Sequence, residues 1–437
     1  MPLLKPVPPL VRLMALVLLA LQPSCGTGRR TDTDAALKEF RKQVDEALPA
    51  VEALTGIHRD GPVKVGMMTK AALGDFFERS LEVEYPDRAL QRRGQCFAEI
   101  GLLPRGYDLA GGLLDLLKEE AGAVYDPASR TLIGIRDLPR EPSRAVNDRM
   151  ILSHEVAHVL QDQVIGIERH SRLGLENIDY EYALRAVIEG MAGSVMLAYA
   201  RNLPVERLPD VQSFWRANLA RASGGGLSRS PRYVAEFLLS PYAEGGAFVQ
   251  SWLRANPGES LEHLLRRLPP SSEQVLHFEK YAEGDVPEEI DLLGPGKILP
   301  GDWELIYANT LGEFDLLQLF RTHAETEAGA AGMAAGWDGC RFEEYRNGSG
   351  ALILFGSSAW DREEDAREFS GGFRTVLEGF RTGDDFTVVQ DGLRVNFVIG
   401  SSDRSMRTAI LEALVRAKQP GSAPRARPGR QSHTPTS

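Results

Sequence analysis

Two histidines stand four residues apart in one apolar segment, with a glutamate directly after the first. They are His154 and His158, and the glutamate is Glu155. Residues four apart lie one turn apart on the same face of a helix, so both imidazoles can point at one cation. Zinc accepts imidazole nitrogen in tetrahedral geometry, and a carboxylate beside it can take a proton from water. The spacing therefore predicts a metal site with Glu155 as general base.

The residues around this motif indicate that its helix is buried. Met150, Ile151, Val159 and Leu160 flank the histidines, and all four are apolar. The alternative to a metal is a pair of core histidines satisfied by hydrogen bonds. Burying two imidazoles and a carboxylate without partners costs free energy, and a metal ion would offset that cost. The apolar surroundings therefore favour the metal.

A third ligand is expected from the next long helical segment, residues 180–199. Glu189 stands among apolar residues there, and a cation would give its carboxylate a partner. Gly190 and Gly193 follow it, although glycine inside a helix costs about 1 kcal/mol relative to alanine. Both glycines are explained if this helix presses closely against another, such as the helix of the two histidines. The alternative for Glu189 is an ion pair with an arginine such as Arg185.

A hydrogen-bond donor is also expected near the metal, because negative charge on a reacting carbonyl usually needs more than one stabilising group. His277 and Tyr242 are the leading candidates for this catalytic role, with Tyr281 beside them. Each has a structural alternative: His277 could cap a helix, and the Tyr242 hydroxyl could bond to backbone. Asp179 and Glu181 are better suited to orienting the histidines.

The chain has 437 residues and a net charge of -11, which argues against nucleic acid as its main partner. Hydrophobic periodicity predicts an α+β protein, with a mostly helical domain and small sheet at 33–330 and a small α+β unit at 336–417. The first domain is expected to have helices at 34–54, 70–81, 109–121, 147–165, 180–199, 211–222, 233–239 and 245–255, and strands at 63–68, 121–125 and 130–135. Residues 418–437 are rich in Pro, Arg, Ser and Gly, which predicts a disordered tail.

Residues 1–25 are typical of a secretory signal. Two basic residues precede an apolar run from Leu13 to Leu21, which is shorter than the ~20 residues of a membrane span. The alternative, a buried N-terminal helix, fits the early prolines poorly. Cys25 suits a lipid anchor, whereas Gln22 does not, so lipidation and plain secretion both stay open. Either interpretation predicts an extracytoplasmic protein, secreted or anchored at the cell envelope.

The zinc motif resembles the gluzincin type of zinc protease, in which HExxH is followed by Glu-Gly on the next long helix. More narrowly, the chain resembles an uncharacterised family of bacterial and archaeal surface or lipoprotein metalloproteases. The segments that carry this resemblance are Gly101–Pro104, Tyr125–Pro127, His154–Gln163, Ile188–Gly190, Pro241–Gly245 and Ser272–Tyr281. Shorter matches at Gly312–Phe314, Gly336–Trp337 and Trp360–Asp361 extend it into the C-terminal unit.

The resemblance implies a zincin fold, with a small sheet packed on the two helices and Glu189 as the third ligand. It also implies that Arg130–Ile135 is the edge strand of that sheet and holds a peptide backbone by strand addition. Cys96 and Cys340 stand where the family usually has other residues. An oxidising compartment would permit a disulfide between them, and their pairing stays open.

The predicted function is an exported zinc peptidase acting on polypeptides, with membrane attachment through Cys25 if that residue is lipidated. His154, His158 and Glu189 would hold Zn²⁺. One alternative is a non-catalytic surface lipoprotein, a binding module whose metal only stabilises the fold; another is the same fold acting on other bonds. Structural zinc sites are usually closed and cysteine-rich, whereas this one has an open position and a base. The sequence leaves the oligomeric state open.

Overall fold

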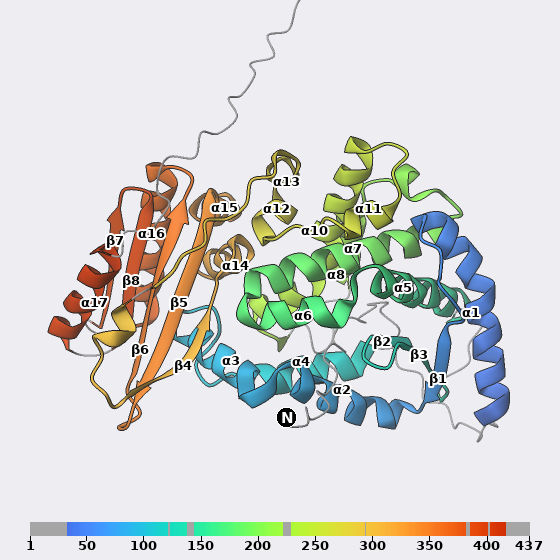
Figure 1. Cartoon of the computed structure of the whole chain (residues 1–437), viewed down its shortest axis with the longest axis horizontal. Coiled ribbons are helices and arrows are strands. Elements are labelled where there is room, and N and C mark those ends of the chain that lie inside the picture. The colour runs from blue at the N-terminus through green and yellow to red at the C-terminus, as the bar shows by residue number, and fades with distance from the viewer. Residues whose placement is uncertain are drawn as a thin grey trace, which may run out of the picture.

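Two separate β-sheets lie in different parts of a mostly helical molecule (Figure 1). The computed structural model describes residues 33–120, 123–137, 144–221, 229–292, 294–381, 385–400 and 403–416. Elements α1 to α13, with the small sheet, are called the helical region below, and elements β4 to α17 are called the sheet unit. The expected α+β class is confirmed. The predicted signal at 1–25 and the predicted tail at 418–437 lie outside the described residues.

The helices of the helical region are α1 (Thr33–Thr55), α2 (Lys70–Glu84), α3 (Ala89–Glu99), α4 (Leu109–Glu120), α5 (Arg144–Ile165), α6 (Ile167–Glu176), α7 (Ile178–Arg201), α8 (Val211–Arg221), α10 (Arg232–Ala255), α11 (Leu261–Leu265), α12 (Ser272–Leu276) and α13 (Phe278–Glu283). Those of the sheet unit are α14 (Glu313–His323), α15 (Glu327–Ala334), α16 (Glu363–Phe380) and α17 (Arg404–Arg416). Short 3₁₀ turns lie at Pro86–Arg88, Val205–Arg207 and Pro295–Lys297.

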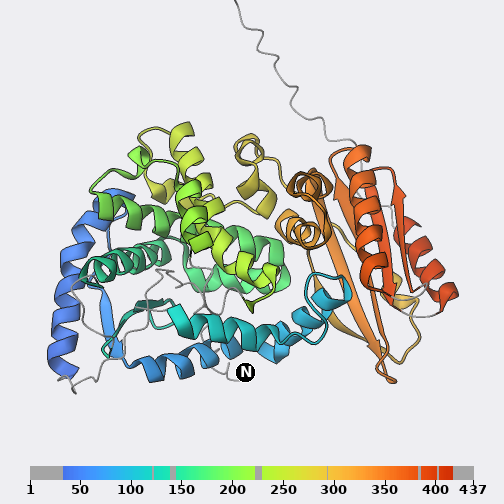
Figure 2. The same ribbon diagram turned by 180° about the vertical axis from the view of Figure 1, so that it is seen from behind.

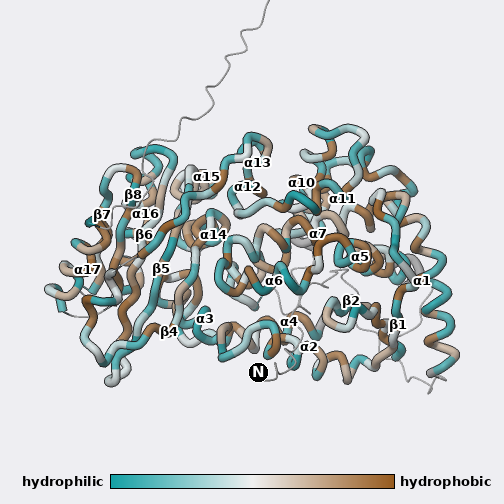
Figure 3. Tube along the Cα trace, in the orientation of Figure 1, coloured by the Kyte–Doolittle hydropathy of each residue, from teal (hydrophilic) through white to brown (hydrophobic). Residues whose placement is uncertain are grey.

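Helices α5, α7 and α10 form the centre of the helical region. Much of α5 and α7 is hydrophobic (Figure 3), and α7 is buried over nearly its whole length. A helix that is apolar on all sides must be surrounded by protein or by lipid. Among the described helices, only α7 is long and apolar enough to cross a membrane by length and composition, and its burial is that of a core helix.

Glycines let α7 and α10 touch through their backbones. A Cβ on Gly245 would overlap the carbonyl oxygen of Ala186, and a Cβ on Gly190 would overlap the backbone of Gly245. Gly193 instead faces the ring of Trp215 in α8. The predicted close packing of α7 at its glycines is therefore confirmed. Its partners there are α10 and α8, however, and not the helix that carries the histidines.

The small sheet has the strand order β1-β3-β2. Strand β1 (Lys64–Met68) pairs in parallel with β3 (Thr131–Ile135), and β2 (Ala123–Asp126) pairs with β3 antiparallel. The prediction that Arg130–Ile135 forms the edge strand is therefore wrong. Because β3 has a neighbour on each side it is the central strand, and all five of its residues are buried. The strand of this sheet that contacts α5 most is β2.

The sheet unit contains an antiparallel sheet of order β4-β5-β6-β8-β7. Its strands are β4 (Trp303–Asn309), β5 (Trp337–Asn347), β6 (Leu352–Trp360), β7 (Phe386–Asp391) and β8 (Arg394–Gly400). Successive side chains of a strand point to opposite faces. Leu354 and Phe397 accordingly join the core that contains Phe373 of α16, whereas Phe355 joins the core that contains Ile410 of α17. Helices α14 and α15 lie between this sheet and the helical region (Figure 2).

Some elements differ from the sequence-based expectations. Segments 233–239 and 245–255, expected as separate stretches, belong to one helix, α10, with Pro241 inside it. An internal proline costs about 3 kcal/mol, so the packing of α10 against α7 must outweigh that cost. Strand β4 was not expected, and it pairs with β5 although it lies before residue 336. The sheet therefore begins earlier than the predicted C-terminal unit, while the division into domains stays a prediction.

Candidate metal centre

Helix α5 brings His154 and His158 together because they lie one turn apart on the same face. Their Nε2 atoms are 2.9 Å apart, and the rings meet edge to face with centroids 4.5 Å apart. Glu189 of α7 completes the group. Its Oε2 lies 3.3 Å from Nε2 of His154 and 3.8 Å from Nε2 of His158. The three ligands predicted from the sequence therefore converge in the structure.

The spacing of these three atoms fits one small cation. Two ligands at about 2.0–2.1 Å from a tetrahedral zinc ion lie about 3.3 Å from each other. The separations in the structure run from 2.9 to 3.8 Å. Each of the three residues is at most 1% exposed. Within the described part of the chain, no other group of three metal-ligand side chains lies this close together.

Burial keeps both imidazoles neutral. It lowers the pKa of His154 to about 3, and burial together with the neighbouring His154 lowers the pKa of His158 to about 4. A neutral imidazole has a nitrogen lone pair to offer a metal. Burial also raises the pKa of Glu189, and the nearby His158 and Arg185 limit this rise. Arg185 was the alternative partner expected for Glu189. Its guanidinium lies over the ring of Phe237, 5.0 Å from the ring centroid.

Strand β2 holds the carboxylate of Glu155. Its Oε2 accepts a hydrogen bond of 2.8 Å from the backbone N–H of Tyr125, and its Oε1 has no hydrogen-bond partner among the described residues. Burial raises the pKa of Glu155 well above its usual value; the Tyr125 hydrogen bond opposes this and the nearby Glu189 adds to it. A carboxylate with a raised pKa and one unbonded oxygen suits a group that takes up and releases a proton.

Gln161 is a positioning residue that the sequence-based reasoning missed. Its Oε1 lies 2.7 Å from Nδ1 of His158, and its Nε2 donates to the carbonyl of Ile188 at 2.9 Å. Accepting the Nδ1 proton leaves Nε2 of His158 free for a metal. The second bond ties α5 to α7 beside Glu189. A signal was available, because Gln161 lies three residues after His158 on the same helical face.

Tyr242 and His277, the predicted donors, lie in different surroundings. The Tyr242 ring stacks near that of His154 with centroids 5.9 Å apart, and the nearby Glu189 adds to burial in raising the pKa of the Tyr242 hydroxyl. Tyr242 therefore belongs to the group as a partner of a ligand. His277 lies between α12 and α13, where its Nε2 is 2.8 Å from Oε1 of Glu313 in a separate cavity. The structure does not bring His277 to the metal ligands, and Tyr281 donates to the carbonyl of Arg267.

The two acidic residues expected to orient the histidines have other partners. Asp179 accepts the backbone N–H of Ser272 at 2.8 Å. Glu181 forms a buried ion pair of 2.7 Å with Arg93 and accepts a hydrogen bond from Tyr85. The expectation for both is therefore wrong. Both lie in the first turn of α7, about two to three turns before Glu189, so their side chains reach α3 and α12 instead.

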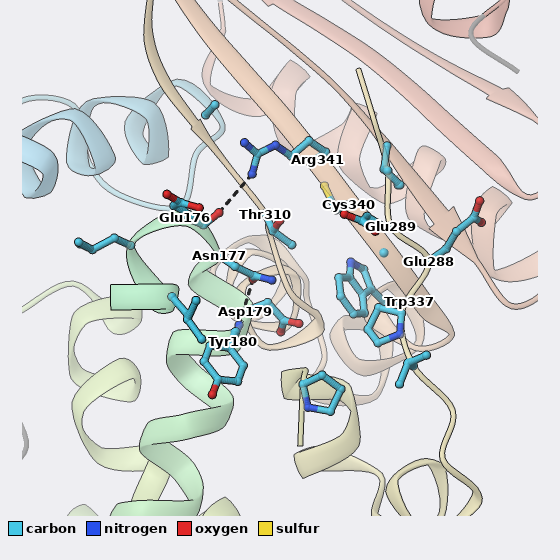
Figure 4. A pocket seen from close by; sticks show the side chains of 18 residues that line it. Glu176, Asn177, Asp179, Tyr180, Glu288, Glu289, Thr310, Trp337, Cys340 and Arg341 are labelled. Atoms are coloured by element: carbon cyan, nitrogen blue, oxygen red, sulfur yellow. Dashed lines mark hydrogen bonds between the residues drawn. The ribbon is translucent and has the colours of Figure 1, made fainter. Parts of the chain in front are cut away.

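A cavity of about 630 Å³ lies apart from this centre, between the α6–α7 turn and the sheet unit (Figure 4). Asn177 lines it from the helical side, Trp337 and Cys340 line it from β5, and Glu289 lines it from the connecting segment. Cys340 and Cys96 are buried free thiols, so the disulfide that the sequence left open is absent from these described residues. None of the predicted metal ligands or catalytic residues lines this cavity, whereas Asp179 does.

Comparisons with known proteins bear mainly on the sheet unit. A family model described as a domain of unknown function, DUF8575, matches residues 304–417. A solved structure from Chloroflexus aurantiacus, described as a candidate hydrolase with a novel fold, shares 15% sequence identity at a TM-score of 0.34, over 58% of this chain and 91% of that one. A likeness this distant supports no assignment. No curated protein matches the sequence.

Proposed function

We propose that the chain is an exported zinc-dependent peptidase of the gluzincin type. His154, His158 and Glu189 are the proposed ligands, and Glu155 is the proposed general base. The observation that carries the proposal is the convergence of three ligand atoms within 4.8 Å of one another. The carboxylate of Glu155, held by β2, adds the proton acceptor that a hydrolase needs. Export is proposed from residues 1–25 of the sequence alone.

The chemistry follows from how each side chain is held. A zinc ion bound by these residues would polarise a peptide carbonyl as a Lewis acid. Oε1 of Glu155 is the oxygen that accepts a proton from the attacking water, because Tyr125 N–H occupies Oε2. Glu155 then passes this proton to the leaving amine. Gln161 keeps the ligand nitrogen of His158 in position, and the ring of Tyr242 packs beside that of His154.

A second candidate is the non-catalytic surface lipoprotein whose metal only stabilises the fold. The observation that favours it is burial: His154, Glu155, His158 and Glu189 are each at most 1% exposed. A peptide must reach the reacting atoms, whereas a structural ion needs no such access. Both candidate functions require the metal, but only the peptidase requires Glu155.

Metal content and peptide cleavage, measured on the same preparations, separate the candidates. The wild-type chain should carry stoichiometric zinc and cleave members of a peptide library. Glu155→Gln should keep its zinc and its fold and lose about 10²–10⁴-fold in cleavage rate. Glu176→Gln, an exposed carboxylate outside the group, is the matched control and should cleave normally.

The outcomes against the proposal are distinct. A wild-type chain that holds zinc and cleaves no peptide, or a Glu155→Gln variant that cleaves like the wild type, would favour the structural candidate. Glu189→Ala should lose zinc, and full retention would show that Glu189 is not the third ligand.

A further inference from the structure

A second cavity, of about 440 Å³, lies on the face of α10 turned away from the candidate metal centre. Ser240 and Glu244 of α10 line it, whereas Tyr242, between them in sequence, contacts His154 and Glu189. Residues two apart point to opposite sides of a helix, so the cavity and the metal group are separate. Its other walls come from α8, α12, α14 and α15. It holds His277, which the proposed chemistry does not use.

Helix α14 presents polar groups to this cavity that its neighbours leave unsatisfied. Glu313, Leu317 and Arg321 follow at four-residue spacing, and Gln318 lies beside Leu317, so all four share one face. Gln318 is fully buried, and neither its Oε1 nor its Nε2 has a hydrogen-bond partner among the described residues. Glu313 is 4% exposed, and its Oε2 likewise has none in that part of the chain.

The cations that line the cavity already have carboxylate partners. His277 lies 2.8 Å from Oε1 of Glu313, Arg216 pairs with Glu244, and Arg321 pairs with Glu327. An anionic ligand would therefore have to displace an existing pair. Among the fully buried atoms of these residues, two acceptors, Oε2 of Glu313 and Oε1 of Gln318, and one donor group, Nε2 of Gln318, have no hydrogen-bond partner in the described part of the chain. Buried polar groups rarely lack a hydrogen-bond partner, so these unpaired atoms indicate a ligand.

We propose that this cavity binds the free amino end of a peptide or amino-acid amide. An α-ammonium group donates to Oε2 of Glu313 and Oε1 of Gln318, and the carbonyl that follows it accepts from Nε2 of Gln318. Leu276, Phe314 and Ala331 supply an apolar wall for a small side chain. His277 holds the Glu313 carboxylate in place through its other oxygen.

Binding at this cavity does not depend on the proposed peptidase activity, because none of the metal ligands lines it. The test is isothermal titration of the full chain with L-alaninamide and with N-acetyl-L-alaninamide, which lacks the ammonium group. We expect the acetylated probe to bind at least tenfold more weakly. The same titration in Glu155→Gln should give the unacetylated probe its wild-type affinity, which separates binding from hydrolysis.

Two variants locate the site. Gln318→Leu removes the unpaired carboxamide, and Glu313→Gln removes the charge while keeping the shape; each should weaken L-alaninamide at least tenfold. Gln318→Leu should also melt at a higher temperature without ligand, because it removes buried polar atoms that lack partners. Glu289→Gln, in the cavity of Figure 4, is the matched control and should bind normally.

Equal affinities for the two probes would overturn the proposal, as would a folded Glu313→Gln chain with wild-type affinity. If Gln318→Leu fails to fold, the Glu313→Gln result decides alone. If neither probe gave a heat of binding, the proposal would also be overturned and the cavity would be assigned to buried water.

Discussion

The candidate metal centre and the contact between α3 and the sheet unit differ in how they accommodate buried charge. At the metal centre, Glu155 and Glu189 are buried beside two neutral imidazoles, and burial raises the pKa of both carboxyl groups. At the contact, the buried guanidinium of Arg381 lies 2.9 Å from the carboxylate of Glu99 in α3 and 2.7 Å from that of Asp385. There, charge is matched by charge of the protein itself.

This difference shows where a cation from outside the chain would stabilise the fold. An unmatched pair of buried carboxylates costs free energy unless the groups are protonated or meet a cation. The sheet unit has one group of the same kind, Glu344 of β5, which is fully buried and has no hydrogen-bond partner for either oxygen among the described residues. No histidines converge on Glu344, so it is an unfavourable buried carboxyl group and not part of a candidate metal centre.

The largest effect is expected where α7 and α10 touch through their backbones. In Gly245→Ala the new methyl group overlaps the carbonyl oxygen of Ala186, so the helices must move apart. Unfolding in urea should show a loss of about 3 kcal/mol. Because Glu189 lies on the displaced face of α7, zinc binding should weaken as well. A stable variant with normal zinc affinity would show that the helical region tolerates rearrangement.

The next effect concerns the group that holds His158. Gln161→Leu removes the acceptor for Nδ1, so the imidazole loses its fixed orientation. Zinc affinity, measured by competition with a chelator, should fall about 10–100-fold. Gln163→Leu on the same helix is the control and should keep wild-type affinity, because Gln163 bonds to the backbone carbonyl of His58 instead. Equal losses in the two variants would contradict the role given to Gln161.

The effect of Glu344 on the sheet unit should be visible in the pH dependence of stability. Burial raises its pKa to about 8 in the folded chain, whereas the carboxyl ionises near 4.5 when the chain unfolds. The folded state thus keeps a proton that the unfolded state releases, and stability falls as pH rises from about 4.5 to about 8. The free energy of unfolding of Glu344→Gln should therefore exceed that of the wild type at pH 8 and match it near pH 4.5. Glu343→Gln, whose side chain points to the other face, should show no such pH dependence.

The smallest effect is expected in α16, where a glycine has room. No atom lies within 4 Å of a Cβ added at Gly371, unlike Gly245. Gly371→Ala should therefore raise the free energy of unfolding by about 0.5–1 kcal/mol, since alanine loses less backbone entropy in a helix. Thermal or urea unfolding measures it. A loss of stability would mean that backbone packing limits the sheet unit as it limits the helical region.

The sequence by itself determined the relations within single elements. Helical geometry places His154 and His158 on one face wherever the helix lies, and a lone carboxylate in an apolar helix made Glu189 a candidate for the same ion. The α+β class followed from hydrophobic periodicity. These predictions depend on spacing along the chain, which the sequence contains.

Only the tertiary structure decided the relations between elements. The Tyr125 N–H that holds Glu155 comes from 30 residues earlier, and the Glu313 that takes His277 away from the metal group comes from 36 residues later. The central place of β3 depends on β1, more than 60 residues earlier, and α10 continues through Pro241 because α7 packs against it. Such contacts result from how apolar faces pack together, and spacing along the chain does not determine that packing.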